Sequence, residues 1–429
     1  MNSSTALGTQ PIISSCYLPN PKVPTLKILF ATHILPFPPD SGGRIGFYNP
    51  LKYLSRHHEM ILFSLVDGTD QSNVSHMPGF CREVVTYHKG QSGDSRRLLR
   101  GAFGRPPGTA SKYFFPEAGE LLRDTIQRHR PDIVELQHLN MAAYLPYCQG
   151  APVILREHNV EYRVWERFAA VQTTWYRKVF FEMLARRVRR YEADMAQRFD
   201  RCITVSEADA LDLYSVSPTA RVQAIPSGVD AEYFAPDPTV AEKPYSMVMT
   251  GSFSWKPKQH NLRVLATEIS PNIRKQLPEA TLTVVGQGIP ADLKRLAEEH
   301  GVTLTGAVPD VRPYIREASL VLNYVESGGG IALKVLEALA MRKAILSNSL
   351  GCEGIDVQHG RDVFLADGPE AFASAAARLL RDAPLRGRLA QAGYNLVRQK
   401  YAWETLAHSF DDLYEELTPK GMATASTSR

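Results

Sequence analysis

Short runs of apolar, β-branched residues alternate with longer stretches of helical periodicity along almost the whole chain. This alternation is typical of parallel sheets whose strands are joined by crossover helices. The first series of predicted strands covers residues 26–33, 60–66, 132–138, 152–158 and 201–206, and the second covers 246–251, 280–286, 302–306, 319–325 and 343–348. The pattern therefore predicts an α/β protein with two doubly wound, Rossmann-like sheets.

A segment with little periodicity separates the two series of strands. Residues 225–245, "IPSGVDAEYFAPDPTVAEKPY", are rich in proline and aspartate, as linkers between domains often are. We expect an N-terminal domain over residues 25–225 and a C-terminal domain over 226–400, facing each other across a cleft. Residues 1–24 and 419–429 are expected to be flexible tails, and residues 1–24 lack the basic and apolar regions of a signal peptide.

Two helical stretches carry distinctive surface patterns. Within residues 401–418, the apolar residues Trp403, Leu406, Phe410 and Leu413 recur at helical spacing. Residues 175–202 predict a long helix with many arginines, which suits either a solvated face or weak peripheral contact with a membrane. Acidic residues interrupt the basic charge of this second helix, so the solvated face is the favoured interpretation.

The composition describes an ordinary globular protein. The 429 residues are 44% hydrophobic and 22% charged, with a net charge of +4 that is too small to indicate a nucleic-acid partner. The five cysteines form neither close pairs nor a metal-binding spacing, which favours the reducing cytoplasm. No apolar run approaches the roughly 20 residues of a membrane span. We expect a cytoplasmic protein, with the inner membrane face as a peripheral location.

The segment "ESGGGIALKVLEALA", residues 326–340, combines a flexible stretch with the start of a helix. Its three consecutive glycines are Gly328, Gly329 and Gly330. A helix opening at Ile331 would aim its free N–H groups at this stretch, and such an end attracts anions. Lys334 in the first turn opposes the helix dipole unless an anion is nearby, so a phosphate would resolve the conflict. An ordinary capped helix in which Lys334 pairs with Glu337 remains the alternative.

Other polar residues follow predicted strands, where open α/β sheets bind their ligands. Gly42 and Gly43 follow the first strand, although a solvent loop leading to a helix near Pro50 would also explain them. His158 ends the apolar strand "PVILREH", where it is either a functional or a structural histidine. Lys256 and Lys258 follow the first strand of the second series.

The segment "VVGQGIPA" fits a G-x-G-x-x-A dinucleotide pattern after a strand. A nicotinamide enzyme would also need an acidic residue at the end of the next strand. That strand ends in Gly306 and Ala307, so we reject the oxidoreductase interpretation.

Taken in order, these motifs resemble the GT-B fold glycosyltransferases, in particular the retaining family 4 enzymes. The likeness extends from about Lys27 to Leu417 and is strongest in "GGGIALKVLEALAMRKAILSNSLGCEGIDV". The segment "IPSGVDAEYF" is similar to the family's domain junction. The segments "HNVEYRVWERF", "YEADMAQRFD" and "TGSFSWKPKQHN" resemble a bacterial subgroup associated with surface-polysaccharide synthesis.

The resemblance implies roles for individual residues. Glu337 would hold the ribose of a sugar nucleotide, and the backbone from Gly329 through Ile331 to Ala332 would approach its diphosphate and sugar. The backbone around Val308 would contact the nucleobase. The remaining implied donor contacts are Gly42, Gly43 and His158 in the N-terminal domain and Lys256, Lys258 and Lys334 in the C-terminal domain.

The resemblance implies a hexosyltransferase-type glycosyltransferase. It would move a sugar from a nucleoside diphosphate sugar to a glycan, lipid-linked or small-molecule acceptor with retention of configuration. No D-x-D motif follows a strand, so we expect no metal and no further cofactor, with Lys334 and a helix N-terminus stabilising the leaving diphosphate. His158 would orient the donor sugar, and the helix over 401–418 would cross back onto the N-terminal domain.

Two other functions remain open on the same fold. The family often has a glutamate where this chain has Gly329. A non-catalytic subunit that binds a nucleotide or a partner, or a nucleotide-sugar epimerase, would therefore also suit the sequence.

Overall fold

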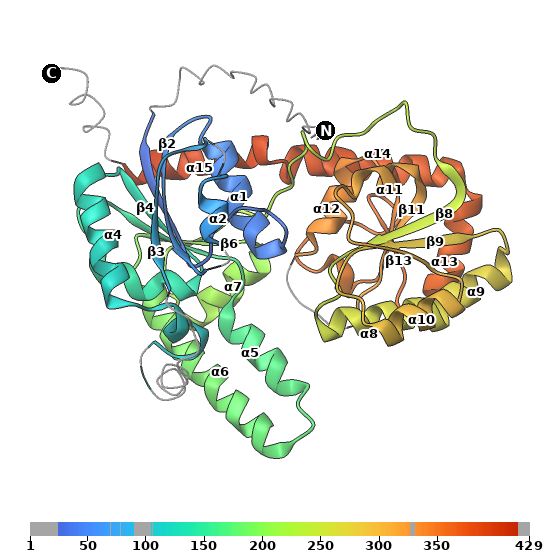
Figure 1. The fold of residues 1–429 in the computed structure, drawn as a ribbon, viewed down its shortest axis with the longest axis horizontal. Helices are drawn as coiled ribbons and strands as arrows, with labels where there is room; N and C mark the ends of the chain where they lie inside the picture. Colours follow the sequence, from blue (N-terminus) through green and yellow to red (C-terminus); the bar gives the residue numbers. More distant parts are fainter. Residues whose placement is uncertain are drawn as a thin grey trace, which may run out of the picture.

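The computed structural model describes residues 25–68, 70–77, 79–89, 104, 106–326 and 331–418. Within these ranges the chain forms two α/β domains, each built on one parallel sheet (Figure 1). The predicted tails at 1–24 and 419–429 lie outside the described residues, as do Gly328, Gly329 and Gly330. The predicted fold class, two doubly wound Rossmann-like sheets, is confirmed.

The strands of the N-terminal sheet are β1 (Lys27–Thr32), β2 (Glu59–Val66), β3 (Cys81–His88), β4 (Ile133–Gln137), β5 (Val153–Glu157), β6 (Arg201–Thr204) and β7 (Val222–Ala224). Their order across the described sheet is β3-β2-β1-β4-β5-β6-β7. The chain reverses direction across the sheet between β1 and β4, and such switch points are where open α/β sheets bind ligands.

The strands of the C-terminal sheet are β8 (Lys243–Thr250), β9 (Thr281–Val285), β10 (Thr303–Gly306), β11 (Ala318–Asn323), β12 (Ile345–Ser347) and β13 (Phe364–Leu365). They lie in the order β10-β9-β8-β11-β12-β13, so the switch point falls between β8 and β11. The two domains therefore repeat one topology.

The helices between the N-terminal strands are α1 (Gly42–Leu54), α2 (Gln71–Val74), η1 (Gly108–Tyr113), α4 (Pro116–His129), η2 (Leu139–Tyr147), α5 (Glu161–Ala170), α6 (Trp175–Ala196) and α7 (Glu207–Val216). Those that follow are α8 (Lys256–Val264), η3 (Leu265–Ile269), α9 (Ser270–Gln276), α10 (Ala291–Glu299), α11 (Arg312–Glu317), α12 (Leu333–Ala340), η4 (Leu350–Cys352), α13 (Pro369–Arg381), α14 (Ala383–Lys400) and α15 (Trp403–Leu417).

The alternation of side chains along β1 shows how both faces of a sheet become buried. Leu29 and Ala31 join the core that contains residues of α4 and α6, whereas Ile28 and Phe30 join the core that contains residues of α1 and α15. Successive residues of a strand point to opposite faces, so an uninterrupted apolar strand requires helices on both sides.

Several boundaries differ from the sequence expectations. The strands β3, β7 and β13 were not predicted, because they are half-buried or short and lie toward the sheet edges. The helix predicted over 175–202 ends at Ala196, since β6 already begins at Arg201. The helix expected near Pro50 instead begins at Gly42 and contains Pro50.

The start of α12 also differs from its prediction. This helix begins at Leu333 rather than at Ile331, and Ala332 before it has a non-helical backbone with φ of −78° and ψ of 83°. Lys334 remains in the first turn, as its second residue. The electrostatic conflict between this lysine and the helix dipole is therefore real.

Two segments cross between the domains and contact each other. The Val229 N–H donates to Tyr401 O at 2.8 Å, and the Trp403 N–H donates to Val229 O at 3.2 Å. A β-carbon on Gly228 would lie 2.6 Å from Leu406 Cδ1 and 2.8 Å from Tyr401 O, so only glycine fits this crossing. The linker is thus held against the segment that leads into α15.

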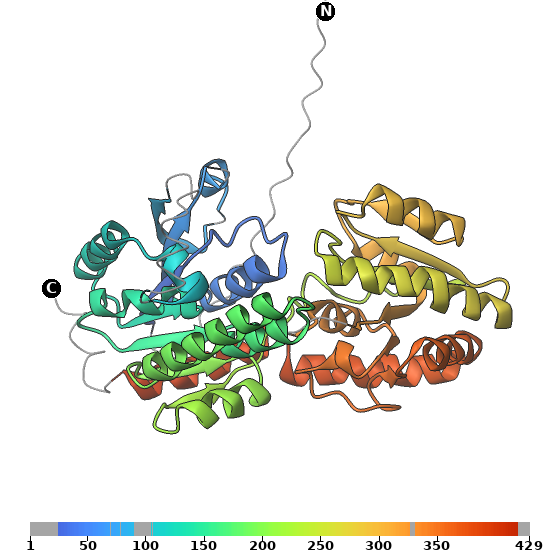
Figure 2. The same cartoon turned by 90° about the horizontal axis from the view of Figure 1, so that it is seen from below.

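The last helix packs on the N-terminal sheet. Trp403, Leu406, Phe410 and Leu413 are buried together with Ile28 and other residues of that sheet. Figures 1 and 2 both show α14 and α15, in red, running along one edge of the two domains. None of the described helices combines the length and the hydropathy that a bilayer-spanning helix needs.

Candidate functional site

Two lysines from separate helices follow the two strands at the switch point of the C-terminal sheet, and the charge of one acts on the other. Lys258 lies in the first turn of α8, after β8, and Lys334 lies in the first turn of α12, after β11. Burial, together with the positive charge of Lys258 and against the negative charge of Glu337, lowers the pKa of Lys334 to about 8. In the described part of the chain, neither lysine forms an ion pair, and neither first turn holds an acidic residue.

This arrangement is electrostatically unfavourable without an anion. Each helix N-terminus carries a partial positive charge, and each lysine adds a full one. Like charges at such a place raise one another's energy, and a bound phosphate removes the penalty. A bound anionic group would therefore compensate the positive charges of the two first turns.

Glu337 lies one turn after Lys334 on the same helix. Burial raises its pKa to about 7, although the neighbouring Lys334 opposes the shift. Among the ion pairs formed by the described residues, none joins Glu337 to Lys334, although each charge influences the pKa of the other. The carboxyl group of Glu337 is half-buried and has no side-chain hydrogen bond there, which leaves it available to a ligand.

Val325 and Glu326, which follow β11, are anchored by hydrogen bonds to α8 and to the residue after β12. Glu326 accepts a hydrogen bond from His260 of α8 at 2.7 Å, and its N–H donates to Asn261 Oδ1 at 3.1 Å. The Val325 N–H donates to Asn348 Oδ1 at 3.0 Å. Glu326, which the sequence left without a role, is therefore held against α8.

The remaining C-terminal candidates lie at the same edge of the sheet with different exposure. Ile331 and Ala332 are half-buried immediately before α12. Val308 follows β10 and packs partly into the core beneath α12. Lys256 is the exposed first residue of α8, and the charge that reaches Lys334 is that of Lys258.

A row of histidines lies at the corresponding edge of the N-terminal sheet. His33, His138 and His158 each follow one of the adjacent strands β1, β4 and β5. The ring centroids of His33 and His138 are 5.0 Å apart, and those of His138 and His158 are 6.5 Å apart. Sequence reasoning identified His158 and missed the other two.

The signal for the missed histidines was present in the sequence. Each of the predicted strands 26–33, 132–138 and 152–158 ends in histidine. Only the order of the strands in the sheet shows that these three ends are neighbours. The backbone of His138 has φ of 77°, a strained conformation for a residue with a side chain.

Hydrogen bonds fix His138 in one orientation. Its Nδ1 accepts from the Asn140 N–H at 3.3 Å, so its Nε2–H donates to Glu161 Oε1 at 3.1 Å. The backbone N–H groups of Glu161 and Tyr162 donate to the buried Glu192 of α6 at 2.7 and 2.9 Å. Glu192 thus caps α5 and connects the "HNVEYRVWERF" and "YEADMAQRFD" segments.

A chain of buried hydrogen bonds orients His158. The His158 Nε2–H donates to Gln137 Oε1 at 3.0 Å, and Gln137 Nε2 donates to Glu135 Oε1 at 2.6 Å. The Tyr414 hydroxyl of α15 donates to the other oxygen of Glu135 at 2.6 Å. The last helix is therefore connected to His158 through β4.

His158 is held as a neutral imidazole. Burial lowers its pKa well below the ordinary value, and the charge of Arg156 and the neighbouring histidines lower it further. Its ring packs edge-on against Phe47 at 4.7 Å, and a β-carbon at Gly46 would lie 3.1 Å from His158 Nδ1. Such an imidazole is a weak base but a well-oriented hydrogen-bonding group.

Gly42 and Gly43 are the first residues of α1, the helix that packs beside His158. Both are exposed, and a β-carbon at Gly42 would meet no atom within 4 Å. They leave the N-terminus of α1 open to a ligand. Among the described residues, no hydrogen bond or ion pair joins this histidine group to the lysines of the C-terminal domain.

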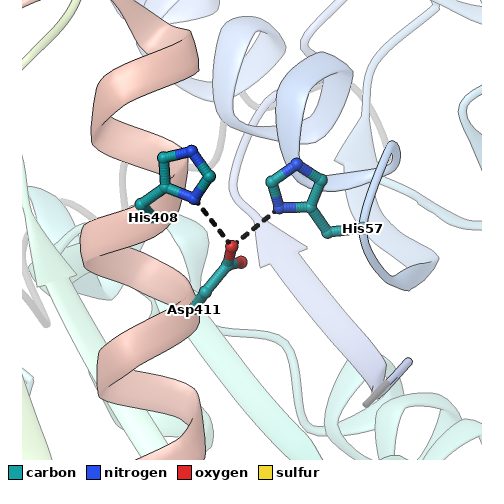
Figure 3. Close-up of side chains that lie close together, drawn as sticks. All are labelled: His57, His408 and Asp411. Atoms are coloured by element: carbon teal, nitrogen blue, oxygen red, sulfur yellow. Dashed lines mark hydrogen bonds and ion pairs between the residues drawn. The ribbon is translucent and has the colours of Figure 1, made fainter. Parts of the chain in front are cut away.

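A separate cluster of His57, His408 and Asp411 lies at the opposite edge of the N-terminal sheet (Figure 3). His57 and His58 precede β2, and Asp411 of α15 contacts them at 2.7 and 2.9 Å. These contacts hold the pKa of the buried Asp411 well below its ordinary value. The cluster fastens α15 to the sheet and is remote from the strand ends that carry His158.

Two family models together match most of the chain. Residues 42–233 match the model described as Glycosyltransferase Family 4. Residues 244–382 match the model described as Glycosyl transferases group 1. Each match falls on one of the two domains.

The curated relatives are distant. The chain is 20% identical over 392 residues to an "Uncharacterized 44.6 kDa protein in cps region" of Klebsiella pneumoniae, a match that covers 87% of this chain and 96% of that protein. It is 27% identical over 220 residues to a "GDP-mannose-dependent alpha-(1-6)-phosphatidylinositol monomannoside mannosyltransferase" of Mycobacterium tuberculosis. That second match covers 46% of this chain and 56% of the relative.

Solved structures share the fold. Anabaena Alr3699/HepE in complex with UDP and glucose has a TM-score of 0.63 at 14% sequence identity, and the match covers 91% of this chain and 100% of that one. This likeness extends over both domains and identifies their arrangement as GT-B.

Proposed function

Because the chain belongs to the glycosyltransferases of group 1 and family 4, we propose that it transfers a sugar from a nucleoside diphosphate sugar with retention of configuration and without a metal ion. The C-terminal domain binds the donor nucleotide, and the N-terminal domain supplies the acceptor side. The acceptor is a glycan, a lipid-linked molecule or a small molecule.

The observation that carries this proposal is the pair formed by Lys258 and Lys334. Both lysines are in helix first turns that hold no acidic residue, and the charge of Lys258 acts on Lys334, where the carboxylate of Glu337 offsets it only in part. A diphosphate provides the missing negative charge. As the bond between the sugar and the phosphate breaks, this charge grows, and oriented donors stabilise it by roughly 2.7–4 kcal/mol each in other enzymes.

Other residues then have complementary tasks. Glu337 binds ribose hydroxyls, the segment through Ile331 and Ala332 approaches the diphosphate and sugar, and the backbone at Val308 contacts the base. Gly42 and Gly43 leave the start of α1 open to the donor phosphate. Lys256 adds positive charge at the rim of the site.

The neutral state of His158 supports an orienting role. Its lowered pKa and its fixed hydrogen bond make it a poor proton acceptor at neutral pH. In the reaction, the bond from the anomeric carbon to the phosphate oxygen breaks and a bond to the acceptor oxygen forms on the same face. The acceptor's proton passes to the departing phosphate oxygen, and the products are a nucleoside diphosphate and a glycoside.

The biological setting is proposed from two further observations. A relative is described as a protein of a cps region, which supports a role in surface-polysaccharide synthesis. The cysteines of the described chain are free, which supports a reducing compartment such as the cytoplasm.

Product analysis tests this function. The purified protein is incubated with UDP-, GDP-, ADP- and dTDP-sugars and an acceptor extract, with and without a chelator. We expect release of one nucleoside diphosphate and an acceptor glycoside whose anomeric configuration, read by NMR, matches the donor. An inverted product would contradict retention, loss of turnover with the chelator would contradict metal independence, and a new sugar nucleotide without glycoside would indicate an epimerase.

A further inference from the structure

The helices α5 and α6 form a hairpin that extends from the N-terminal domain away from its sheet (Figure 1), and Figure 2 shows them side by side. Aromatic rings fill the interface between the two helices. The ring centroids of Phe168 and Phe181 are 4.6 Å apart, and those of Trp165 and Phe181 are 6.0 Å apart. The hairpin has its own small core, so the apolar side chains that point outward do not contribute to the packing between α5 and α6.

The end of this hairpin concentrates exposed apolar side chains. Among the described residues, eight of the thirteen large apolar side chains that are exposed lie on α5, α6 or the turn between them. We call six of them the tip patch: Phe168, Val171, Trp175, Tyr176, Val179 and Phe180. The most exposed are Trp175 at 76% and Val171 at 69%. A soluble monomer rarely exposes so dense an apolar patch unless something binds there.

The patch is also hollowed on one side. A groove of about 570 Å³ opens between Phe168, Tyr176, Arg177 and Phe180. Its walls are mostly aromatic, and its rim carries a cation. Such a surface accepts apolar chains more readily than it accepts a polar partner.

The charge within the tip of the hairpin has one sign, and the acidic residues Glu166 and Glu182 lie just outside it. Residues 167–181 contain Arg167, Arg177 and Lys178 and no acidic residue. Arg177 and Lys178 are exposed and form no ion pair within the described part of the chain. Arg167 instead pairs with Glu353 of the C-terminal domain at 3.0 Å, so the hairpin also contacts the other domain.

The order of side chains along α6 separates apolar and cationic zones. Trp175, Val179 and Met183 lie on one exposed face, and Arg186 and Arg190 continue that face toward the body of the domain. The apolar part from residue 175 to 183 spans roughly 12 Å of helix at 1.5 Å per residue.

We propose that the tip patch docks onto the surface of an anionic lipid bilayer. Trp175 and Tyr176 lie at the headgroup level, the apolar side chains enter the acyl boundary, and Arg177 and Lys178 contact lipid phosphates. This inference goes beyond the proposed transfer reaction and does not depend on it. The structure thus changes the balance for a helix whose sequence alone favoured a solvated face.

Charge distinguishes this partner from a second copy of the chain. In a two-fold dimer the same patch meets itself, so the cations Arg177 and Lys178 of both copies would gather in one interface. An anionic bilayer offers the opposite charge together with an apolar interior. The combination of aromatic, aliphatic and basic side chains at one end of a projecting element matches that surface.

Sedimentation with vesicles tests the proposal on the full-length protein. The vesicles contain phosphatidylcholine alone or phosphatidylcholine mixed with phosphatidylglycerol. We expect binding to the mixed vesicles, weakened by added salt, and little binding to phosphatidylcholine alone. Replacing Arg177 and Lys178 by glutamine should weaken binding by about 30-fold, because each basic residue contributes about 1 kcal/mol near an anionic surface.

The apolar contribution is tested with a matched control. The variant Trp175→Ser/Val179→Ser/Phe180→Ser should lose vesicle binding while keeping the melting temperature and secondary structure of the wild type. The control Leu211→Ser/Tyr214→Ser alters side chains of α7 that are similarly exposed, at 68% and 55%, and should bind like the wild type. Tryptophan emission should shift to shorter wavelength with mixed vesicles in the wild type, and the shift should be lost in Trp175→Phe.

Three results would overturn the proposal. The first is equal binding of the wild type to both vesicle types, or binding to neither. The second is unchanged binding of the folded triple variant. The third is a concentration-dependent dimer in light scattering that the triple variant abolishes without any vesicle binding, which would identify a second copy as the partner.

Discussion

The carboxyl edges of the two sheets are built on one topology but prepared in opposite ways. At the carboxyl edge of the N-terminal sheet, His158 is neutral, and hydrogen bonds through Gln137 and Glu135 connect it to α15. At the carboxyl edge of the C-terminal sheet, the charge of Lys258 acts on Lys334, and neither lysine has an ion-pair partner in the described chain. A satisfied group orients a ligand, whereas an unsatisfied charge attracts one.

The difference indicates that the two domains, although built on one topology, have separate tasks in the proposed transfer reaction. The orientation of His138 and His158 is fixed by hydrogen bonds and packing within the N-terminal domain, including the contact of α15 with Glu135. Burial and the charge of Lys258 disfavour the charged form of Lys334, and in the proposed function a diphosphate compensates these positive charges. In the proposed function, the C-terminal domain therefore provides most of the affinity for the donor, and the N-terminal domain orients the reacting sugar.

Removing both lysines should have the largest effect. In Lys258→Ala/Lys334→Ala, we expect kcat/KM for the donor to fall about 100-fold or more, since each charge-assisted hydrogen bond contributes about 1.5–3 kcal/mol. Steady-state release of nucleoside diphosphate measures the change. A folded double variant with a loss below about tenfold would mean that other groups hold the diphosphate.

Replacing His158 should disturb the orientation of the donor sugar without changing the affinity for the nucleoside diphosphate. His158→Ala should lower kcat by up to about 100-fold, because a small misplacement of the reacting groups has that effect. The dissociation constant of the nucleoside diphosphate should remain that of the wild type, because the lysine pair is intact. Loss of nucleotide affinity in this variant would contradict the proposal that the N-terminal domain orients the sugar while the C-terminal domain binds the nucleotide.

The pH dependence of nucleotide binding should report Lys334. Its pKa is about 8 in the empty protein, so the lysine loses its proton as pH rises above that value. Affinity should then fall by up to about tenfold per pH unit, while Lys334→Arg should stay constant over the same range because arginine keeps its charge. A flat wild-type profile between pH 7.5 and 9.5, read by calorimetry, would exclude Lys334 from the contact.

The same titration has the opposite sign for stability. The folded-state pKa of Lys334 lies below its ordinary value of 10.5, so its buried charge opposes folding below about pH 8. That opposition disappears as pH rises from about 8 toward 10.5. Affinity and this contribution to stability should therefore change in opposite directions, which separates a binding effect from general unfolding.

The smallest effect should come from the far end of the hydrogen-bond chain. Tyr414→Phe leaves the buried Glu135 without its hydroxyl donor and should lower the free energy of unfolding by about 1–3 kcal/mol. It should also lower kcat less than the His158 substitution does. The control Tyr401→Phe removes a hydroxyl that accepts from the Asp356 N–H at 2.8 Å in the C-terminal domain, and kcat should be unchanged there.

Much of the fold could be predicted from the sequence because strand periodicity is local. Every strand predicted from apolar runs is present, and the stripe of Trp403, Leu406, Phe410 and Leu413 is buried. The strands β7 and β13 are only three and two residues long, so their pattern carries little information. The half-buried β3 lies at the sheet edge and lacks an apolar run.

The candidate site could be predicted only in part from the sequence, because it depends on which strands and helices are neighbours in space. Lys334 could be assigned to a first turn from its distance to the glycines, and the structure confirms that position. The approach of Lys258, the row formed with His33 and His138, and the path from Tyr414 to His158 require the order of strands and the crossing of α15. The roles given to Gly328, Gly329 and Gly330 stay predictions.

Calorimetric titration with nucleoside diphosphates tests the central claim most directly. UDP, GDP, ADP and dTDP are each added to the wild type, Lys258→Ala, Lys334→Ala and Lys256→Ala, with a chelator present. We expect one nucleotide to bind the wild type, with affinity lowered roughly 10- to 150-fold in Lys258→Ala and Lys334→Ala and much less in Lys256→Ala. If no nucleotide binds, or if Lys256→Ala loses as much affinity as Lys258→Ala, the paired lysines are not the diphosphate site.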